Sequence, residues 1–231
     1  MSYSRYVAIK DFRQMVKTIC NDNAFAERVT ALLVVFYSTG MTLSEVSRLK
    51  VGDVVDAQGL LKASFELTPE SSFNGNIRRI YWIAGWLDSV VSAYLTWRKE
   101  TFPDHCLGDG TLPLEAPFFV DDIGEGYKEQ KATEINQKIY KTSTALSLKI
   151  RQVHREGKIK DGNAESARRS FSVWLALGHL TGTPVHVDWL RILRGDQRLS
   201  TTMSAIHKDM PEGFDPLVAV FADANPLHLF R

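Results

Sequence analysis

The segment from residue 163 to residue 207 begins with Asn163, which is followed by Ala164-Glu165-Ser166-Ala167-Arg168-Arg169-Ser170-Phe171. It ends Arg194-Gly195-Asp196-Gln197-Arg198-Leu199-Ser200-Thr201-Thr202-Met203-Ser204-Ala205-Ile206-His207. Its apolar residues recur at helical spacing, which predicts three helices over residues 166–177, 184–193 and 200–207. Arginines recur through the first two of them. The segment is therefore predicted to be a helical unit with a basic side.

Charge is unevenly distributed along the chain. Residues 149–200 contain ten basic and five acidic side chains, whereas the whole chain of 231 residues has a net charge of only +1. A local excess of positive charge attracts a phosphate backbone. A solvated helical surface without a nucleic-acid partner has the same composition, and charge alone favours that plainer interpretation.

The composition excludes several classes of protein. Cys20 and Cys106 form no C-x-x-C pair, so neither a disulfide framework nor a zinc site is predicted. The first ten residues lack the apolar stretch of a signal peptide. The longest apolar run, Leu32–Phe36, is too short to cross a bilayer. We expect a cytoplasmic protein with no membrane segment, metal or cofactor.

The remaining pattern predicts further helices and one hairpin. Thr42 and Glu45 form a capping box that starts a helix, and Phe73-Asn74-Gly75-Asn76 supplies the turn of a hairpin. Together these signals predict a mainly α fold with a small antiparallel β-sheet (α+β). The predicted elements are helices over 6–20, 24–37, 42–50, 85–100, 133–156 and 215–223, strands over 60–67 and 77–83, and a short strand at 118–120.

Three separated segments resemble one family in one order. The run from Thr39 to Val54, Thr39-Gly40-Met41-Thr42-Leu43-Ser44-Glu45 and onward, resembles the T-G-x-R-x-S-E signature of the tyrosine recombinases, the phage integrase family. Glu165 to Phe171 is similar to the family's H-x-L-R-[HR]-[ST]-F box, and Leu193 to Met203 to its L-x-G-H-x-x-[IL]-x-[ST]-T segment. The resemblance covers roughly residues 6–207 and implies a catalytic-domain fold that binds duplex DNA.

The resemblance also implies that most of the catalytic residues are missing. The family cleaves one strand with a tyrosine, while two arginines and a hairpin lysine act on the scissile phosphate and the leaving oxygen. Of these and the two motif histidines, only the second arginine is retained, as Arg168. The hairpin lysine has no counterpart, since no lysine lies between residues 62 and 99, and no tyrosine follows residue 140. The other positions hold Thr42, Glu165, Asp196 and Ala205.

This pattern predicts a degenerate site with no catalytic residue. Glu165 and Asp196 put negative charge where a phosphate would bind, so Arg168 either contacts DNA or pairs with one of these carboxylates. A metal site built on the two carboxylates is a further alternative. We expect one recombinase-catalytic-like domain over residues 1–210 and no N-terminal core-binding domain. A C-terminal tail over 211–231 either docks on its own domain or is exchanged in a homodimer or higher oligomer.

Three functions remain open. The leading hypothesis is a catalytically inactive DNA-binding protein, such as a transcription regulator or an architectural factor of a plasmid, phage or integrative element. The alternatives are a protein-interaction module without DNA binding and an active recombinase with non-standard residues. The candidate contacts to double-stranded DNA are Arg48, Lys50, Arg78, Arg79, Arg168, Arg169, Arg191, Arg194 and Arg198.

Overall fold

The computed structural model describes residues 6–22, 26–82, 87–135 and 138–209. This part of the chain is mostly helical and has two separate two-stranded antiparallel sheets, which confirms the predicted fold class. The elements in chain order are α1 (Ile9–Asp22), α2 (Ala26–Thr39), α3 (Leu43–Arg48), α4 (Val51–Val54), β1 (Ser64–Leu67), β2 (Arg78–Tyr81), α5 (Leu87–Thr101), the 3₁₀ helix η1 (Pro103–His105), β3 (Gln130–Ile135), β4 (Lys138–Thr142), α6 (Thr144–Glu156), α7 (Ala164–Ala176), α8 (Val187–Arg194) and α9 (Leu199–Asp209).

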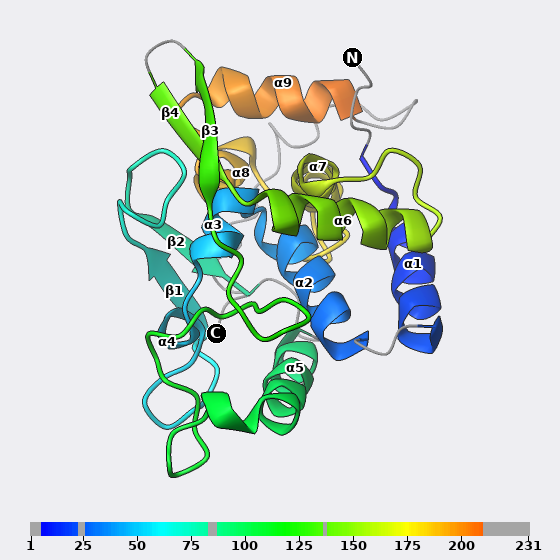
Figure 1. Ribbon diagram of the computed structural model, residues 1–231. Coiled ribbons are helices and arrows are strands. Elements are labelled where there is room, and N and C mark those ends of the chain that lie inside the picture. Colours follow the sequence, from blue (N-terminus) through cyan, green and yellow to red (C-terminus); the bar gives the residue numbers. More distant parts are fainter. Residues whose placement is uncertain (1–5, 23–25, 83–86, 136–137, 210–231) are drawn as a thin grey trace.

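Helix α2 forms the centre of the molecule (Figure 1). Its sequence is apolar on nearly every side, and all its residues from Arg28 to Thr39 are buried, as expected for a core helix. Helices α1, α5 and α7 pack against it. The indole of Trp174 on α7 stacks on Tyr37 of α2 with ring centroids 5.2 Å apart and donates a hydrogen bond to the carbonyl of Val7. The core therefore fixes the position of α7.

Helix α3 and the β1–β2 hairpin form where the local signals predict them. The Thr42 side chain accepts a hydrogen bond from the Glu45 amide, and the Glu45 carboxylate accepts one from the Thr42 amide, which completes the capping box. Strands β1 and β2 pair with Phe65 opposite Ile80. Strand β2 also packs against α8, so the hairpin is held beside the segment that carries the second and third recombinase-like motifs.

The predicted helix over residues 133–156 is wrong in its first part. Residues 130–135 and 138–142 form the antiparallel pair β3–β4, which stands at the edge of the molecule in Figure 1, and β4 packs against α3. Ile135 and Ile139 have helical spacing, but the segment is also rich in β-branched residues, which favour strands. Helix α6 begins only after Ser143, whose hydroxyl accepts a hydrogen bond from the Leu146 amide.

The predicted strand at 118–120 is wrong: Val120 makes only an isolated bridge to Gly126. The predicted helix over 215–223 and the tail over 211–231 lie outside the described residues. Within the described part of the chain, no helix combines the length and the apolar character needed to cross a membrane.

Candidate nucleic-acid site

Three arginines and two carboxylates meet where α3, β2, α7 and the α8–α9 junction come together. We call this group the arginine network and define it as Arg78, Arg168, Arg194, Glu45 and Asp196. The five residues come from positions far apart in the chain, yet their side chains form one connected set of hydrogen bonds. All three arginines are predicted DNA contacts, and Asp196 occupies a position where the recombinase motif has histidine.

Asp196 is the acceptor at the centre of the network. Its Oδ2 accepts hydrogen bonds from Arg194 Nε at 2.6 Å and from Thr202 Oγ1 at 2.8 Å. Its Oδ1 lies 3.3 Å from Arg168 Nη2. Arg194 also donates to Ser172 Oγ and is only 3% exposed. The carboxylate of Asp196 thus serves both guanidinium groups, which confirms the interpretation that Arg168 pairs with an acidic neighbour.

Burial shapes the electrostatics of the network. Burial first, and then the nearby guanidinium of Arg194, lowers the pKa of Arg168 to about 10. Burial likewise lowers the pKa of Arg78. Both arginines still carry their charge at neutral pH, so the two carboxylates are required as partners.

Glu45 and Arg78 form the second half of the network. Glu45 is completely buried, and Arg78 Nη1 lies 3.4 Å from each of its carboxylate oxygens. The same nitrogen donates to the carbonyl of Arg194 at 2.8 Å. Gly195 makes this approach possible, because a Cβ at this position would lie 2.6 Å from Arg78 Cδ. Its φ of 71° also ends α8 in the left-handed conformation that glycine favours.

The β1–β2 loop covers the network from outside. The ring centroid of Phe73 lies 4.9 Å from Arg168 Cζ, a cation–π contact. Asn74 Nδ2 donates to the carbonyl of Gly195 at 3.0 Å, and the amide of Phe73 lies 3.4 Å from Glu45 Oε1. Each guanidinium of the network therefore donates to protein oxygens. The ring of Phe73 lies over Arg168, which is the motif arginine that this chain retains.

Of the other degenerate positions, Thr42 hydrogen-bonds Glu45 of the network through the capping box, whereas Glu165 and Ala205 are not part of the network. Thr42 caps α3, and Ala205 is half-buried on α9. Glu165 is exposed and lies 3.4 Å from Arg169 Nε on the next turn of α7, so it does not join Asp196. In the described residues no cluster of histidine, cysteine and carboxylate side chains could hold a metal ion.

The remaining predicted DNA contacts differ in whether they have an acidic partner. In the described part of the chain, Arg191 and Arg198 have no ion-pair partner; Arg191 is half-buried and Arg198 is exposed. The paired ones are Arg48 with Glu129 at 2.9 Å, Lys50 with Glu115 at 2.5 Å, Arg79 with Glu66 at 2.7 Å and Arg169 with Asp209 at 3.3 Å.

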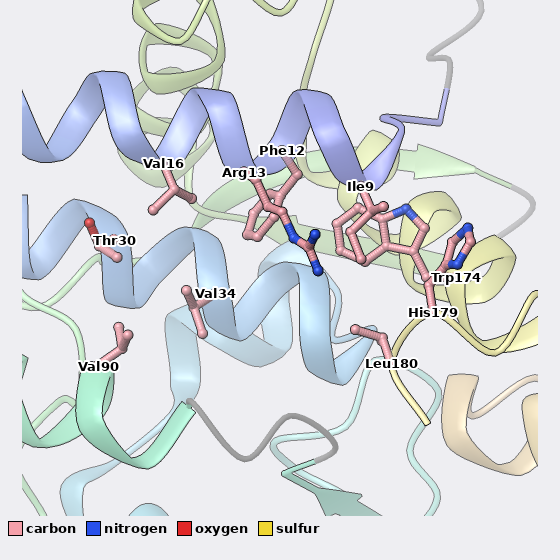
Figure 2. A pocket seen from close by; sticks show the side chains of 10 residues that line it. All are labelled: Ile9, Phe12, Arg13, Val16, Thr30, Val34, Val90, Trp174, His179 and Leu180. Carbon is pink, nitrogen blue, oxygen red and sulfur yellow. The ribbon is translucent and has the colours of Figure 1, made fainter. Parts of the chain in front are cut away.

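An apolar cavity of about 340 Å³ lies elsewhere, between α1, α2, α5 and the segment that follows α7. Figure 2 shows Trp174 and Phe12 in its wall, with the Arg13 guanidinium and the His179 ring beside them. None of its lining residues belongs to the arginine network. Apart from Arg13, Thr30 and His179, the lining side chains are apolar or aromatic, so the cavity and the network are separate features of the fold.

Comparisons with known proteins separate fold from sequence. No protein-family model and no curated protein matches the chain. Among solved structures it is similar to XerA recombinase, with 15% identity, a TM-score of 0.63 and coverage of 90% of this chain and 61% of that one. A lambda integrase dimer bound to a COC′ core site gives 11% identity, a TM-score of 0.58 and coverage of 93% and 63%.

The XerH site-specific recombinase bound to palindromic difH substrate gives 15% identity, a TM-score of 0.59 and coverage of 90% and 51%. The fold is that of a tyrosine recombinase catalytic domain. This confirms the fold that the three motifs implied. The recombinase-like chain spans between about half and two thirds of the length of these structures, and at this level of identity the likeness extends to the fold alone.

Proposed function

We propose that this recombinase-like protein binds double-stranded DNA and does not cleave it. Its role would be regulatory or architectural, as a transcription regulator or an accessory factor of a plasmid, phage or integrative element. The fold supports DNA binding, since the Tn1549 transposon integrase, another similar structure, was solved in complex with transposon right end DNA. The observation that carries the loss of cleavage is the internal pairing of the arginine network.

Cleavage needs a nucleophile and free donors for the phosphate oxygens. Ala205 provides no nucleophile, and Thr42 offers no positive charge at the first arginine position. Arg168 and Arg194 already donate to Asp196. A phosphate entering here would have to displace a buried carboxylate, which costs several kcal/mol when charges lose their partners.

Several other cations remain suited to contact phosphate. Arg191 and Arg198 are without a charged partner in the described part of the chain. Lys50 and Arg79 belong to exposed pairs, with 52% and 54% of their side chains accessible. Such exposed pairs contribute at most about 1 kcal/mol, so a phosphate competes with the carboxylate at little cost.

The proposal includes residues 1–210 as one domain. It also includes a homodimer or higher oligomer formed through the tail over residues 211–231. Two linked half-sites raise the affinity of weak single contacts. Light scattering of the full chain and of a chain ending at residue 210, with and without duplex DNA, measures this. An unchanged oligomeric state on truncation would contradict the role of the tail.

Fluorescence anisotropy with duplex DNA at low and moderate salt tests DNA binding. We expect binding at low salt that weakens steeply as salt rises, because phosphate contacts release counterions. Absence of binding to any duplex at low salt would contradict the proposal.

Cleavage is tested with nicked suicide duplexes that trap a covalent adduct. We expect none, and a trapped adduct would instead favour an active recombinase with non-standard residues.

A second candidate is a protein-interaction module on the same scaffold. The net charge of +1 and the many paired cations favour it. Charge reversal at Arg191 and Arg198 discriminates between the two functions, because both side chains lie outside the buried network. Loss of DNA binding by a folded variant supports the first function. Wild-type protein that binds no duplex but captures a protein partner supports the second.

A further inference from the structure

A second group of cations lies at the end of α6 and in the loop that leads to α7. Arg151 and Arg155 are exposed and four residues apart on one face of α6. Lys158 and Lys160 follow in the loop and are also exposed. Arg151, Arg155 and Lys160 line an open cleft of about 560 Å³, and Lys158 lines a neighbouring hollow with Lys160. We call these four side chains the basic cleft.

The basic cleft is not neutralised by its surroundings. Its four cations make no ion pair or side-chain hydrogen bond with any residue that the structure describes. Three carboxylates lie nearby: Glu156 accepts a hydrogen bond from the side-chain amide of Gln152, and Asp11 lines the hollow with Lys158 and Lys160. The third, Asp161, lines the cleft itself. Four positive charges against three negative ones leave a net positive charge, which attracts an anion.

The loop that carries the lysines is held firmly by the core. Two hydrogen bonds of a Schellman motif end α6: the Lys158 amide donates to the Arg155 carbonyl, and the Ile159 amide to the His154 carbonyl at 2.7 Å. A Cβ on Gly157 would lie 2.1 Å from Met15, and one on Gly162 would lie 2.3 Å from the His154 ring. Such close packing presents the cations in a fixed arrangement, which lowers the entropic cost of binding.

Lys158 occupies a backbone position that normally favours glycine. Its φ is 62°, and Asp161 in the same loop has a φ of 58°. Among the described residues these are the only non-glycine ones with positive φ. Glycine ends a helix here without the steric cost that a Cβ brings. A lysine at this position adds strain that a glycine would not, and it supplies one positive charge to the cleft.

The start of α7 contributes to the same surface. Gly162 and Asn163 line the cleft, and Asn163 caps the 13-residue helix. A helix N-terminus carries a partial positive charge that favours anions. The end of α6 carries the opposite partial charge, which Arg155 offsets within the last turn. Arg151 lies before that turn and Lys160 beyond the helix, so the helix end does not account for them.

We propose that the basic cleft binds the phosphate backbone of duplex DNA and is a principal contact surface, outside the arginine network. This inference rests on the proposed function. It adds Arg151, Arg155, Lys158 and Lys160 to the DNA-binding residues. The phosphate oxygens accept hydrogen bonds from the guanidinium and ammonium groups, without reading the base sequence.

Charge reversal tests the cleft. The double variant Arg151→Glu/Arg155→Glu is compared with Arg13→Glu/Lys17→Glu, which reverses two exposed cations with the same spacing on α1. Arg13 lines the apolar cavity of Figure 2, not the cleft. Affinity for a duplex of random sequence is measured by anisotropy at low salt, and circular dichroism checks folding. We expect the cleft variant to lose at least about tenfold in affinity and the control to stay within about twofold of the wild type.

A cleft variant that keeps wild-type affinity would overturn the inference and leave the proposed function standing. A wild-type protein that binds no duplex would overturn both.

A pair of glycine variants separates the effect of Lys158 on DNA binding from its effect on stability. Lys158→Gly and Asp161→Gly both relieve positive-φ strain, so both should raise the melting temperature. Only Lys158→Gly should weaken DNA binding, whereas Asp161→Gly should keep or strengthen it. Equal DNA affinity of the two variants would contradict the role of the lysine.

Discussion

The arginine network and the basic cleft use the same kind of side chain in opposite ways. In the network, each guanidinium donates to oxygens of the protein, and both Arg194 and Asp196 are less than a tenth exposed. In the cleft, Arg151 and Arg155 are exposed and have no charged partner in the described chain. A retained arginine at a recombinase-like position is therefore weak evidence for DNA contact until its partners are known.

The energetic reason lies in burial. Moving a charged side chain out of water costs several kcal/mol unless a partner compensates. The arginines of the network therefore need Asp196 and Glu45 as partners. These carboxylates supply the oxygens that a phosphate would otherwise provide to Arg168 and Arg78. Exposed cations carry no such cost and remain available to an external anion. We therefore interpret the network as structural and the cleft as the place for binding.

Removal of the central acceptor should have the largest effect. Asp196→Ala leaves the buried Arg194 and the partly buried Arg168 without their carboxylate, which should lower the free energy of unfolding by about 3–5 kcal/mol. The matched control is Glu165→Ala, whose carboxylate is 52% exposed and should contribute less than about 1 kcal/mol. Urea unfolding followed by circular dichroism measures both. A loss below 1 kcal/mol for Asp196→Ala would mean that the network does not stabilise the fold.

A pair of glycines tests the packing of the network on β2. Gly195→Ala places a Cβ against Arg78 in addition to the left-handed backbone, so it should cost about 2–3 kcal/mol. Gly59 has a similar φ of 78° and open space around it, so Gly59→Ala should cost only about 1 kcal/mol. Thermal or urea unfolding gives the difference between them. Equal costs would show that Arg78 moves aside freely.

A smaller effect concerns the histidine beneath the cleft loop. Tyr37 Oη and the Ile150 carbonyl hydrogen-bond the His154 ring, and burial lowers its pKa. The unfolded chain then binds a proton below about pH 6.5 that the folded chain resists, so stability should fall by up to about 1.4 kcal/mol per pH unit as pH drops. Urea unfolding between pH 8 and 5 measures this slope. His154→Gln should flatten it, whereas His207→Gln on the exposed part of α9 should not.

Local patterns predicted most of the fold, because their causes are local. The capping box of Thr42 and Glu45 and the turn after Phe73 depend on neighbours a few residues away. The β3–β4 hairpin was missed because Ile135 and Ile139 suit both a helix and a strand, and long-range packing decides between them.

The candidate site was less predictable. Arg78 finds its acceptors 33 and 116 residues away in the chain, and no local signal reports such a pairing. The cations of the cleft contributed to the positive excess over residues 149–200, but nothing in the sequence separates Arg151 from a solvated surface arginine. Only the structure shows that Lys158 occupies a strained position beside it.

Hydrogen exchange of the wild-type protein, with and without a duplex of random sequence at low salt, compares the two regions directly. We expect slower exchange on DNA binding in peptides that cover residues 149–163. We expect unchanged exchange in peptides over residues 42–47 and 73–78, which contain Glu45, Phe73 and Arg78 of the closed network and its cover. Protection confined to those two peptides, with residues 149–163 unchanged, would contradict this expectation.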